Sequence, residues 1–483
     1  MPPSRLVLFS LLTAWANLLH QLSYPEWIKG LHPIGWLLFL CSLAGIIKPS
    51  SWRIFVTLMV LRVSYTVAWI PMIRGHLFLE GLFTGGILVL IGREAWRLGR
   101  TGPGQRGDEE AWFDCFAPLL RVTTLIVYIA VTLSKLNVDF FDPQRSAAVQ
   151  FLLWTERSNS FLPTGPWTRQ MAIWGTLLCE AGIPLLLCWR RTRWWGLALG
   201  LAFHTLLGLT PLKIASFSLT MCLLLFSWMP RESARLIHEG WLRLSHRLSM
   251  SPRRLGLMLS GLALLTGLVY AARNGIGSQM RALDLGLGLW WWQTALMALA
   301  LGWVRPARAE ATWASLGQPS WLSRACLGVV VFNCLCPYLG LKTRTTLTMH
   351  CNLRTEKGHW NHLFLSERLR IFGYQDDLVM ILESDLPDFA HLAQRKMPLP
   401  FFEFRRWCRL VPHDFQVRYQ RGDAPPQFFE RKNGVISDAR LTEGSRLAEW
   451  FLCFNPVGAG HDYLPGFVRR VGPARNIVPE IPR

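Results

Sequence analysis

The sequence contains few charged residues. Aspartate, glutamate, lysine and arginine make up 17% of its 483 residues, whereas hydrophobic residues make up 51%. Soluble domains carry about 25% charged residues, so this composition excludes an ordinary soluble chain. The 24 tryptophans and the positive mean hydropathy of +0.24 support the same conclusion. We therefore expect an integral membrane protein.

Acidic residues are scarcer than basic ones. The chain has 51 Lys and Arg against 31 Asp and Glu, a net charge of +20. Residues 1–344 hold 32 basic and 15 acidic residues, or +17 of that charge, mostly in short loops between apolar runs. A basic excess in a soluble protein would indicate nucleic acid, but basic short loops are typical of the cytoplasmic side of polytopic membrane proteins. We expect a lipid bilayer as partner and no nucleic acid.

The sequence also lacks the cysteine patterns of metal and redox sites. Its 11 cysteines form no CxxC pair and no Cys/His cluster at zinc spacing, which argues against a metal site or a thioredoxin-like centre. A cleavable signal peptide is not expected either. The first apolar run, residues 6–22, follows a single basic residue and precedes no small-x-small site, so we interpret it as the first membrane span.

Apolar runs long enough to approach the ~20 residues of a membrane span occur about eleven times. The expected spans are residues 6–22, 33–47, 54–73, 77–92, 114–134, 170–189, 194–212, 214–229, 254–272, 283–304 and 323–341. Two of them, 77–92 and 214–229, are short enough to be half-spans, so we expect about nine to eleven full spans.

The arginine-rich loops give the expected orientation. If all eleven spans cross, four of these loops fall on the same side, which is then the cytoplasm. Their residues are Arg93, Arg97, Arg100 and Arg106; Arg190, Arg191 and Arg193; Arg231, Arg235, Arg243, Arg247, Arg253 and Arg254; and Arg305 and Arg308. We therefore expect a cell-membrane (inner-membrane) protein with a cytoplasmic N-terminus and a periplasmic, extracytoplasmic C-terminal domain.

The chain changes character after Arg344, where long apolar runs stop and charge rises. Alternating patterns predict strands at 345–353 and 415–419, and helical spacing predicts a helix at 401–410. The expected fold is an α-helical polytopic membrane bundle, residues 1–344, with a small C-terminal α+β extramembrane domain, residues 345–483. That domain has three cysteines and can form at most one internal disulfide.

Ionisable residues inside the expected spans are the most informative positions, because a charge is costly in hydrocarbon. They are Arg62, His76, Glu80, Arg121, Lys135, Glu180 and His204. Each has a structural interpretation. The arginines and glutamates can form ion pairs between helices, each histidine can be a hydrogen-bonded bundle residue, and Lys135 at the end of its span can extend to water.

Four motifs in order resemble one family. The first is Tyr128-Ile-Ala-Val-Thr-Leu-Ser-Lys135-Leu-Asn-Val-Asp, an aromatic residue and small residues before Lys-Leu-Asn. The others are Arg74-Gly-His76-Leu-Phe-Leu-Glu80-Gly-Leu, then Phe203-His204 followed by Pro211-Leu-Lys, and finally Pro337-Tyr338-Leu-Gly with Met349-His-Cys-Asn-Leu-Arg354. Together they resemble the vitamin K-dependent gamma-carboxylase family, also called the HTTM (horizontally transferred transmembrane) domain, over residues 5–360.

This resemblance implies a bundle that oxidises a hydroquinone by epoxidase/carboxylase-type (lyase) chemistry. The implied cofactor is a reduced vitamin K-type naphthoquinone, without a metal. Lys135 would be the base, His76 and His204 would orient the substrate or move a proton, and Tyr128 and Phe203 would bind the ring. A lysine serves as a base at neutral pH only when burial favours its neutral form. We expect His76, Lys135 and His204 to converge on one cavity in the outer half of the membrane.

Three classes of function remain open on the sequence alone. The first is a hydroquinone-oxidising enzyme that acts on a lipophilic quinol and a secreted or membrane protein substrate. The second is a non-catalytic HTTM protein that assists maturation, export or assembly of a secreted or membrane partner through its outer domain. The third is a transporter, for which intramembrane charges are typical but for which the sequence has no inverted repeat.

Overall fold

A computed structural model gives the fold of most of the chain. It describes residues 3–23, 32–99, 102–103, 108–158, 163–208, 214–273, 278–304, 316, 320–348, 350–411, 413–433, 435–436 and 445–458. Several residues named above lie outside this described part, namely Arg100, Arg106, Pro211, Arg305, Arg308 and Met349.

Every expected span overlaps a helix in the described part of the chain, although the ends differ by up to several residues. The helices are α1 (Arg5–Ser23), α3 (Pro33–Ile47), α4 (Trp52–Trp69), α5 (Gly75–Leu98), α6 (Asp108–Lys135), α9 (Pro166–Cys188), α10 (Arg193–Leu207), α11 (Ile214–Phe226), α13 (Pro252–Arg273), α14 (Ser278–Trp303) and α16 (Trp321–Leu339). Four further elements were not expected: α7 (Val138–Phe141), α8 (Ala147–Ser158), the 3-10 turn η1 (Arg190–Thr192) and α12 (Ser233–Arg247).

Five of the described helices are long and apolar enough to cross a bilayer: α1, α5, α6, α9 and α16. They indicate a membrane protein. Others are shorter: α3, with 15 residues, is about 22 Å long at 1.5 Å per residue, less than the ~30 Å of hydrocarbon. The expected count of about nine to eleven full spans therefore stays a prediction.

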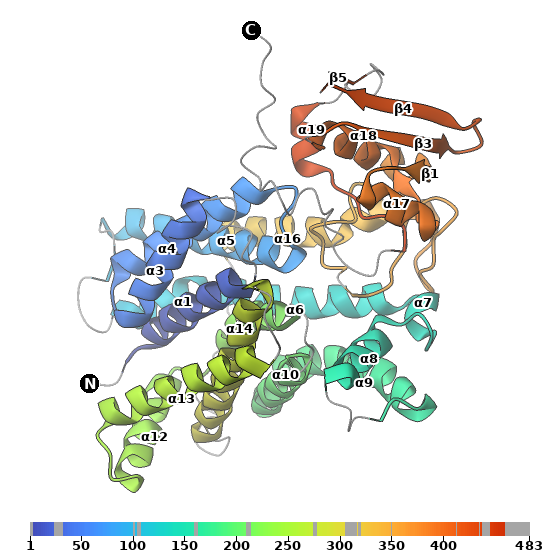
Figure 1. Cartoon of the computed structure of the whole chain (residues 1–483). Helices are drawn as coiled ribbons and strands as arrows, with labels where there is room; N and C mark the ends of the chain where they lie inside the picture. Colours follow the sequence, from blue (N-terminus) through green and yellow to red (C-terminus); the bar gives the residue numbers. More distant parts are fainter. Residues whose placement is uncertain are drawn as a thin grey trace.

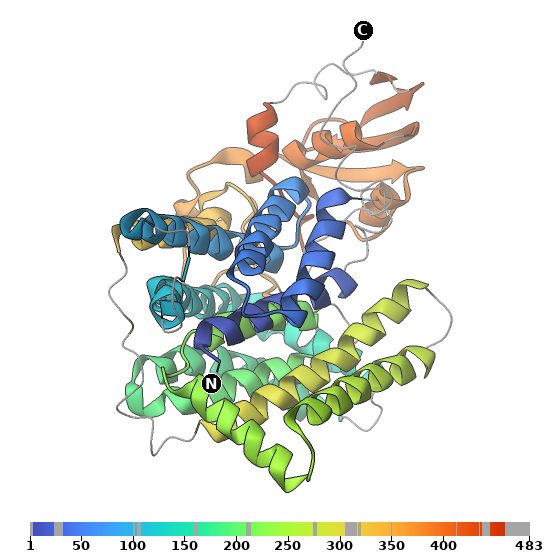
Figure 2. The ribbon, with the colours of Figure 1, turned by 90° about the vertical axis from the view of Figure 1, so that its left-hand side faces the viewer.

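The helices pack around one extended apolar core, in which the Phe9 ring of α1 lies 5.8 Å from Phe113 and 5.6 Å from Phe116 of α6. Figure 1 shows α6 and α16 crossing the molecule, with the C-terminal strands above their right-hand ends. Figure 2 shows α13 and α14 as a helical pair along one side. The ends of α6 and α16 nearest the strands are Lys135 and Leu339, so they position the site described below.

The C-terminal part contains one antiparallel sheet with the strand order β2-β1-β3-β4-β5. Its elements are β1 (Leu378–Ser384), α17 (Pro387–Gln394), β2 (Leu399–Pro400), α18 (Phe401–Leu410), β3 (Phe415–Arg421), β4 (Gln427–Lys432), β5 (Val435–Ile436) and α19 (Arg446–Phe451), preceded by the 3-10 turns η2 (Glu367–Leu369) and η3 (Gly373–Gln375). Phe404 and Trp407 of α18 are fully buried in the core on this sheet. The predicted helix at 401–410 and the predicted strand at 415–419 are both confirmed.

The predicted strand at 345–353 is wrong. Its described residues form bends and a turn, and three of them, Thr345, His350 and Asn352, have positive φ values of 55° to 59°, outside the extended region. Thr345 and Leu347 are both buried, so the apparent alternation reflects packing of an irregular segment. The first strand begins only at Leu378, and the domain boundary at 344/345 stays a prediction. All 11 cysteines are free, including Cys351, Cys408 and Cys453.

Gly340 ends α16 in a left-handed conformation, with φ +82°. A methyl group there would also overlap the carbonyl oxygen of Phe372. We expect Gly340→Ala to lower the free energy of unfolding by on the order of 2 kcal/mol, because it combines a strained φ with an overlap on backbone. Thermal unfolding in detergent measures this. Gly328→Ala in the same helix, where the methyl group meets open space, should be neutral or stabilising; equal losses in both variants would contradict the prediction.

Candidate functional site

Lys135, the last residue of α6, is paired with a carboxylate inside the protein. Its Nζ donates to Glu180 Oε1 of α9 at 2.8 Å and lies 2.8 Å from Oε2. Both side chains are only 7% exposed. Burying either charge alone would cost several kcal/mol, so each requires the other. The amine therefore does not extend to water, and the interpretation of Lys135 as a snorkelling lysine is wrong.

His204 of α10 joins two other helices. Its Nε2 is hydrogen-bonded to the Tyr128 hydroxyl of α6 at 2.9 Å, and its Nδ1 to Ser218 Oγ of α11 at 3.1 Å. All three side chains are buried. The Phe203 ring lies edge-on to His204 at 5.3 Å. A phenol, an imidazole and a hydroxyl in series can pass a proton from one to the next, because each both donates and accepts.

His76, at the start of α5, belongs to a second buried polar group. Its Nε2 is hydrogen-bonded to Ser216 Oγ at 2.9 Å. The neighbouring His20 of α1 contacts the Ser216 carbonyl through Nε2 at 2.9 Å and Glu80 Oε2 through Nδ1 at 3.1 Å. Glu80 also faces Arg62 Nε at 3.4 Å. His76 thus lies beside a charged cluster contributed by α1, α4, α5 and α11.

The predicted ion pairs are confirmed only in part. Arg62 and Glu80 pair between the neighbouring helices α4 and α5, as expected. Glu180 instead pairs with Lys135. Arg121 donates from Nε to the Ser227 carbonyl at 2.8 Å, beyond the end of α11.

The two predicted histidines bind neighbouring serines of α11, and Lys135 lies near the segment that follows α16. On α11, Ser216 binds His76 and Ser218 binds His204. In the segment that follows α16, His350 lies within electrostatic range of His76, and the adjacent Cys351 within range of Lys135. The two histidines therefore share α11 as a neighbour, whereas the partner of Lys135 is Glu180 of α9. A single cavity shared by them stays a prediction.

Residues that follow α16 in the chain cover the end of α6 that carries Lys135. Asn137 Nδ2 donates to the carbonyls of Ser134 at 2.8 Å and Cys351 at 2.6 Å. His362 Nε2 donates to the Leu133 carbonyl at 3.0 Å. The last carbonyls of a helix have no partner within it, and here side chains from beyond the helix supply the partners. The C-terminal part thereby fixes the end of α6 that carries Lys135.

His362 and Cys351 are neutral in this arrangement. Burial lowers the pKa of His362, against the opposing effect of its hydrogen bond to Leu133. Its Nδ1 accepts from the amides of Phe364 and Leu365 at 3.1 and 2.9 Å, which requires the proton to be on Nε2. Burial likewise raises the pKa of the Cys351 thiol. Neither group therefore adds a charge at this end of α6.

Asn361 is the centre of a hydrogen-bond cluster on the same helix end. Its Nδ2 donates to Asp139 Oδ2 at 2.7 Å, to the Asn352 carbonyl at 2.9 Å and to Asn137 Oδ1 at 3.3 Å. Its Oδ1 accepts from the Arg354 amide at 2.8 Å. Asp139 in turn pairs with Arg354 at 2.6 Å. Four bonds from one buried side chain thus join α7 to the segment after α16.

Tyr338 of α16 has a buried hydroxyl without a hydrogen-bond partner in the described part of the chain. Its ring lies edge-on to His362 at 5.7 Å, and it is within electrostatic range of Cys351. Buried hydroxyls are normally hydrogen-bonded, so an unsatisfied one calls for an explanation. A bound molecule with a polar oxygen would supply the missing partner.

Sequence reasoning missed several residues of this region: His20, Ser216, Ser218, Asn361 and His362. The signal for His20 was available, because it is a histidine inside the first apolar run, like the histidines that were singled out. The serines carry no such signal. Asn361 and His362 lie outside the spans, and only folding brings them to the end of α6.

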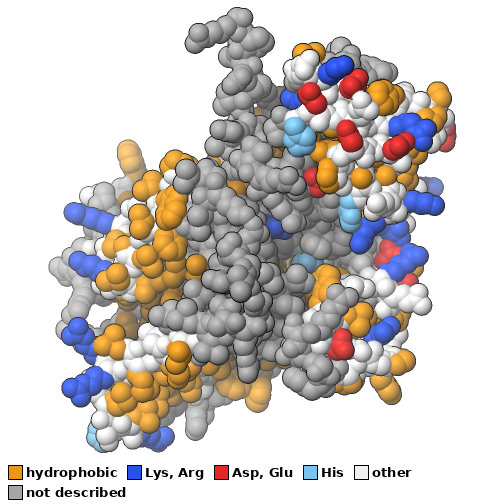
Figure 3. Space-filling model, viewed as in Figure 1, with side chains coloured by type: hydrophobic (Ala, Val, Ile, Leu, Met, Phe, Trp, Pro, Cys, Tyr) orange, Lys and Arg blue, Asp and Glu red, His pale blue; other side chains and the backbone are white. Residues whose placement is uncertain are grey.

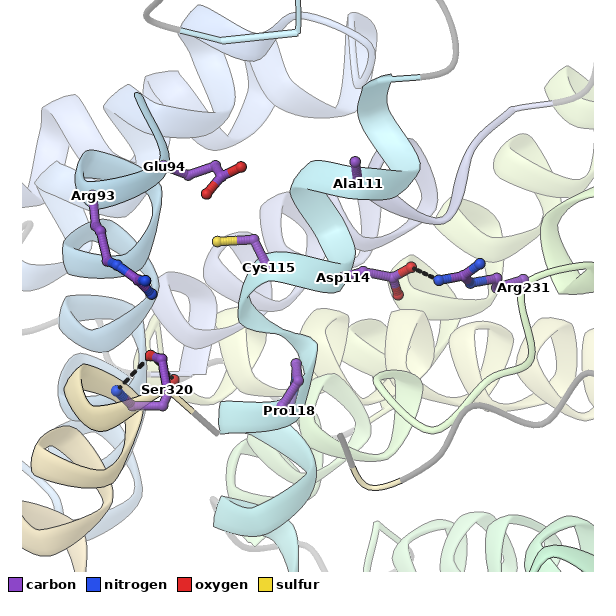
Figure 4. Close-up of a pocket in the computed structure, with 9 residues that line it drawn as sticks. Arg93, Glu94, Ala111, Asp114, Cys115, Pro118, Arg231 and Ser320 are labelled. Atoms are coloured by element: carbon purple, nitrogen blue, oxygen red, sulfur yellow. Dashed lines mark hydrogen bonds and ion pairs between the residues drawn. The ribbon is translucent and has the colours of Figure 1, made fainter. Parts of the chain in front are cut away.

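A cavity of about 400 Å³ lies at the opposite ends of α5 and α6 (Figure 4). It is lined by Arg93, Glu94, Ala111, Asp114, Cys115, Pro118, Arg231, Ser320 and Ser323. Asp114 and Arg231 pair across it at 2.8 Å. None of the predicted site residues lines it. Lys135 is 20 residues or about 30 Å along α6 from Cys115, so this cavity is separate from the candidate site.

In the described ranges, no group of three or more His, Cys, Asp or Glu side chains is placed to hold a metal ion.

No known family, curated protein or solved structure matches the chain.

Proposed function

We propose that the chain is a membrane enzyme that takes a proton from a hydroxyl of a lipophilic hydroquinone, with Lys135 as the base. The observation that carries this proposal is the buried Lys135–Glu180 pair at the end of an apolar helix. When a buried amine contacts a carboxylate, their shared proton can lie on the amine or on the carboxylate. A base in hydrocarbon needs this property, because the amine must be neutral to accept a proton.

Proton transfer within the pair produces the neutral amine that acts as the base. At 2.8 Å, Nζ can pass a proton directly to Glu180 Oε1, leaving a neutral amine and a neutral acid. The low dielectric of the bundle reduces the cost of this neutral state relative to the ion pair. The amine then takes the substrate proton and becomes an ammonium again. Tyr128 and His204, hydrogen-bonded at 2.9 Å, can pass a proton between themselves elsewhere in the bundle.

The groups near the pair support a reduced vitamin K-type ring as the substrate. Once deprotonated, such a ring would be oxidised by oxygen. The unsatisfied Tyr338 hydroxyl can bind a ring oxygen, and Phe203 and Tyr128 offer aromatic surface beside His204. A tail of isoprene units would enter from lipid between the helices. His76 would orient or protonate the other end of the substrate. Carboxylation of a secreted or membrane protein belongs to the same proposal through the family resemblance.

A non-catalytic HTTM-type role is the second candidate. The observation that favours it is that Lys135 and Glu180 satisfy each other, as ion pairs with a purely structural role do. In that case the C-terminal domain would contact a secreted or membrane partner during maturation, export or assembly.

We further propose that the protein lies in the cell (inner) membrane with its N-terminus in the cytoplasm. Figure 3 shows lysines and arginines with few acidic neighbours along the left edge of the helical part, and mixed charges on the C-terminal domain. This asymmetry supports a cytoplasmic location for the basic edge and an extracytoplasmic one for the C-terminal domain.

The proposal is tested with purified protein in detergent. We expect conversion of reduced vitamin K to its epoxide in the presence of oxygen and bicarbonate, above the rate in detergent alone. Product is measured by liquid chromatography. A correctly folded preparation that binds the hydroquinone but never converts it would favour the non-catalytic role, and one that does not bind it would exclude the site.

A further inference from the structure

Residues 363–374, here called the apolar loop, expose an unusual number of large apolar side chains. They are Leu363, Phe364, Leu369, Ile371, Phe372 and Tyr374. Phe364 and Ile371 are each 74% exposed. Single exposed apolar residues are normal on a protein surface, but six within twelve consecutive residues form a patch that indicates an interaction.

The apolar loop is attached to the ends of two helices that can span the membrane. The Leu363 amide donates to the Leu136 carbonyl, just after α6, at 2.9 Å. The amides of Ile371 and Phe372 donate to the Leu339 carbonyl, at the end of α16, at 3.2 and 3.0 Å. These backbone bonds fix the depth of the loop: it lies level with the helix ends, where the hydrocarbon meets the headgroups.

A second element with exposed apolar side chains packs on α16. The Phe451 ring of α19 stacks on Phe332 of α16 at 6.2 Å, about two turns before the end of that helix. Leu447 and Trp450 of α19 are exposed beside this contact. Tryptophan is enriched at membrane interfaces, so exposed Trp450 suits the same side of the bilayer as the loop.

We propose that the apolar loop is immersed in the outer lipid leaflet and anchors the C-terminal domain on the bilayer. The loop is bonded to the end of α16, a helix whose exposed side chains include Val329, Val331, Phe332 and Leu335. These side chains belong to a helix long and apolar enough to span a membrane, so lipid is the partner that also covers the loop.

The charges of the apolar loop fit this position. Arg370 pairs with Glu367 and Asp376, each at 2.8 Å, so these groups are largely neutralised within the loop. Arg368 is exposed and can reach lipid phosphate. The binding is therefore mainly apolar, and it should persist at high salt.

Fluorophore labelling in lipid nanodiscs tests the proposal. Cys188, the exposed native cysteine, is first replaced by serine. An environment-sensitive NBD group is then attached at Phe364→Cys or Ile371→Cys, two positions whose exposure makes the substitution harmless to folding. We expect blue-shifted emission at both positions, and about twofold or stronger quenching by a lipid that carries a nitroxide near its headgroup, as for a segment 5–10 Å into the interface.

Phe428→Cys provides the matched control, because Phe428 is 63% exposed on β4, away from the helix ends. Its label should emit as in water and resist the nitroxide lipid, and the labelled Cys188→Ser background gives the baseline. The same emission and quenching at positions 364, 371 and 428 would overturn the proposal. So would a blue shift without quenching by lipid, since that result assigns the loop to a protein partner or to a second copy of this chain.

Discussion

Replacement of Lys135 by arginine is expected to reduce turnover of reduced vitamin K on the order of a hundred- to ten-thousand-fold, the typical contribution of a general base. Arginine keeps the positive charge and can still pair with Glu180, but its guanidinium stays protonated and cannot accept the substrate proton. Because the ion pair is retained, the thermal unfolding midpoint should change little. Turnover assays and thermal unfolding on the same preparation measure both effects.

Ser134→Ala is the control for this prediction. Ser134 precedes Lys135, and its Oγ donates to the Val131 carbonyl within the same helix turn at 3.0 Å. Its loss removes this bond and a hydrogen bond with the Cys351 side chain but leaves the Lys135–Glu180 pair in place, so turnover should stay within a few-fold of wild type. If the Lys135→Arg protein were as active as wild type, Lys135 would not be the base, and the strongest reason for regarding the chain as an enzyme would be lost.

The helices were the part of the fold that the sequence predicted well. A helix in lipid must satisfy its backbone hydrogen bonds internally, so an apolar run such as 33–47 predicts a helix from local information alone, and α3 has the same bounds. Local sequence does not determine which helices cross the whole bilayer, because crossing also depends on helix tilt and on the neighbouring helices. Only five of the described helices meet the requirement by length and composition. α12 was missed because an amphipathic helix contains no long apolar run.

The irregular segment 345–353 could not be predicted from alternation. Thr345 and Asn352 adopt positive φ because their surroundings fix them: the Asn352 side chain, for instance, accepts from the Ala147 amide at 2.7 Å and donates to the Arg145 carbonyl at 3.0 Å. These partners lie more than 200 residues away in the chain. A pattern of period two contains no information about such contacts.

The sequence singled out three buried ionisable residues but not their pairings, and their role in a site stays a prediction. Lys135, His76 and His204 were singled out as costly groups in hydrocarbon, and all three are buried. The partner of Lys135 depends on which helix packs against α6, and Glu180 lies 45 residues away on α9. The serines of α11 that bind the two histidines are ordinary residues in an apolar run. Only the packing of that helix between α5 and α10 gives them a role.

Replacement of Asn361 by leucine is expected to lower the free energy of unfolding by on the order of 3 kcal/mol. The leucine side chain has a similar volume but makes none of the four hydrogen bonds of Asn361, and it leaves the Asn352 carbonyl and the Arg354 amide without that partner. Each buried polar group that loses its partner costs about 1–3 kcal/mol. Thermal and denaturant unfolding in detergent measure the loss.

Asn333→Leu is the matched control, because Asn333 is also a buried asparagine but makes a single hydrogen bond, from Nδ2 to the Thr345 carbonyl at 3.1 Å. Its loss should cost about 1 kcal/mol. Asn361→Leu should in addition reduce turnover, since the cluster fixes Asn137 and the end of α6 next to Lys135, whereas Asn333→Leu leaves that end in place. Equal destabilisation by the two variants would show that the cluster around Asn361 contributes no more than one ordinary bond. The C-terminal part would then have to be held on the helices by its apolar contacts, such as that of Phe451 with Phe332.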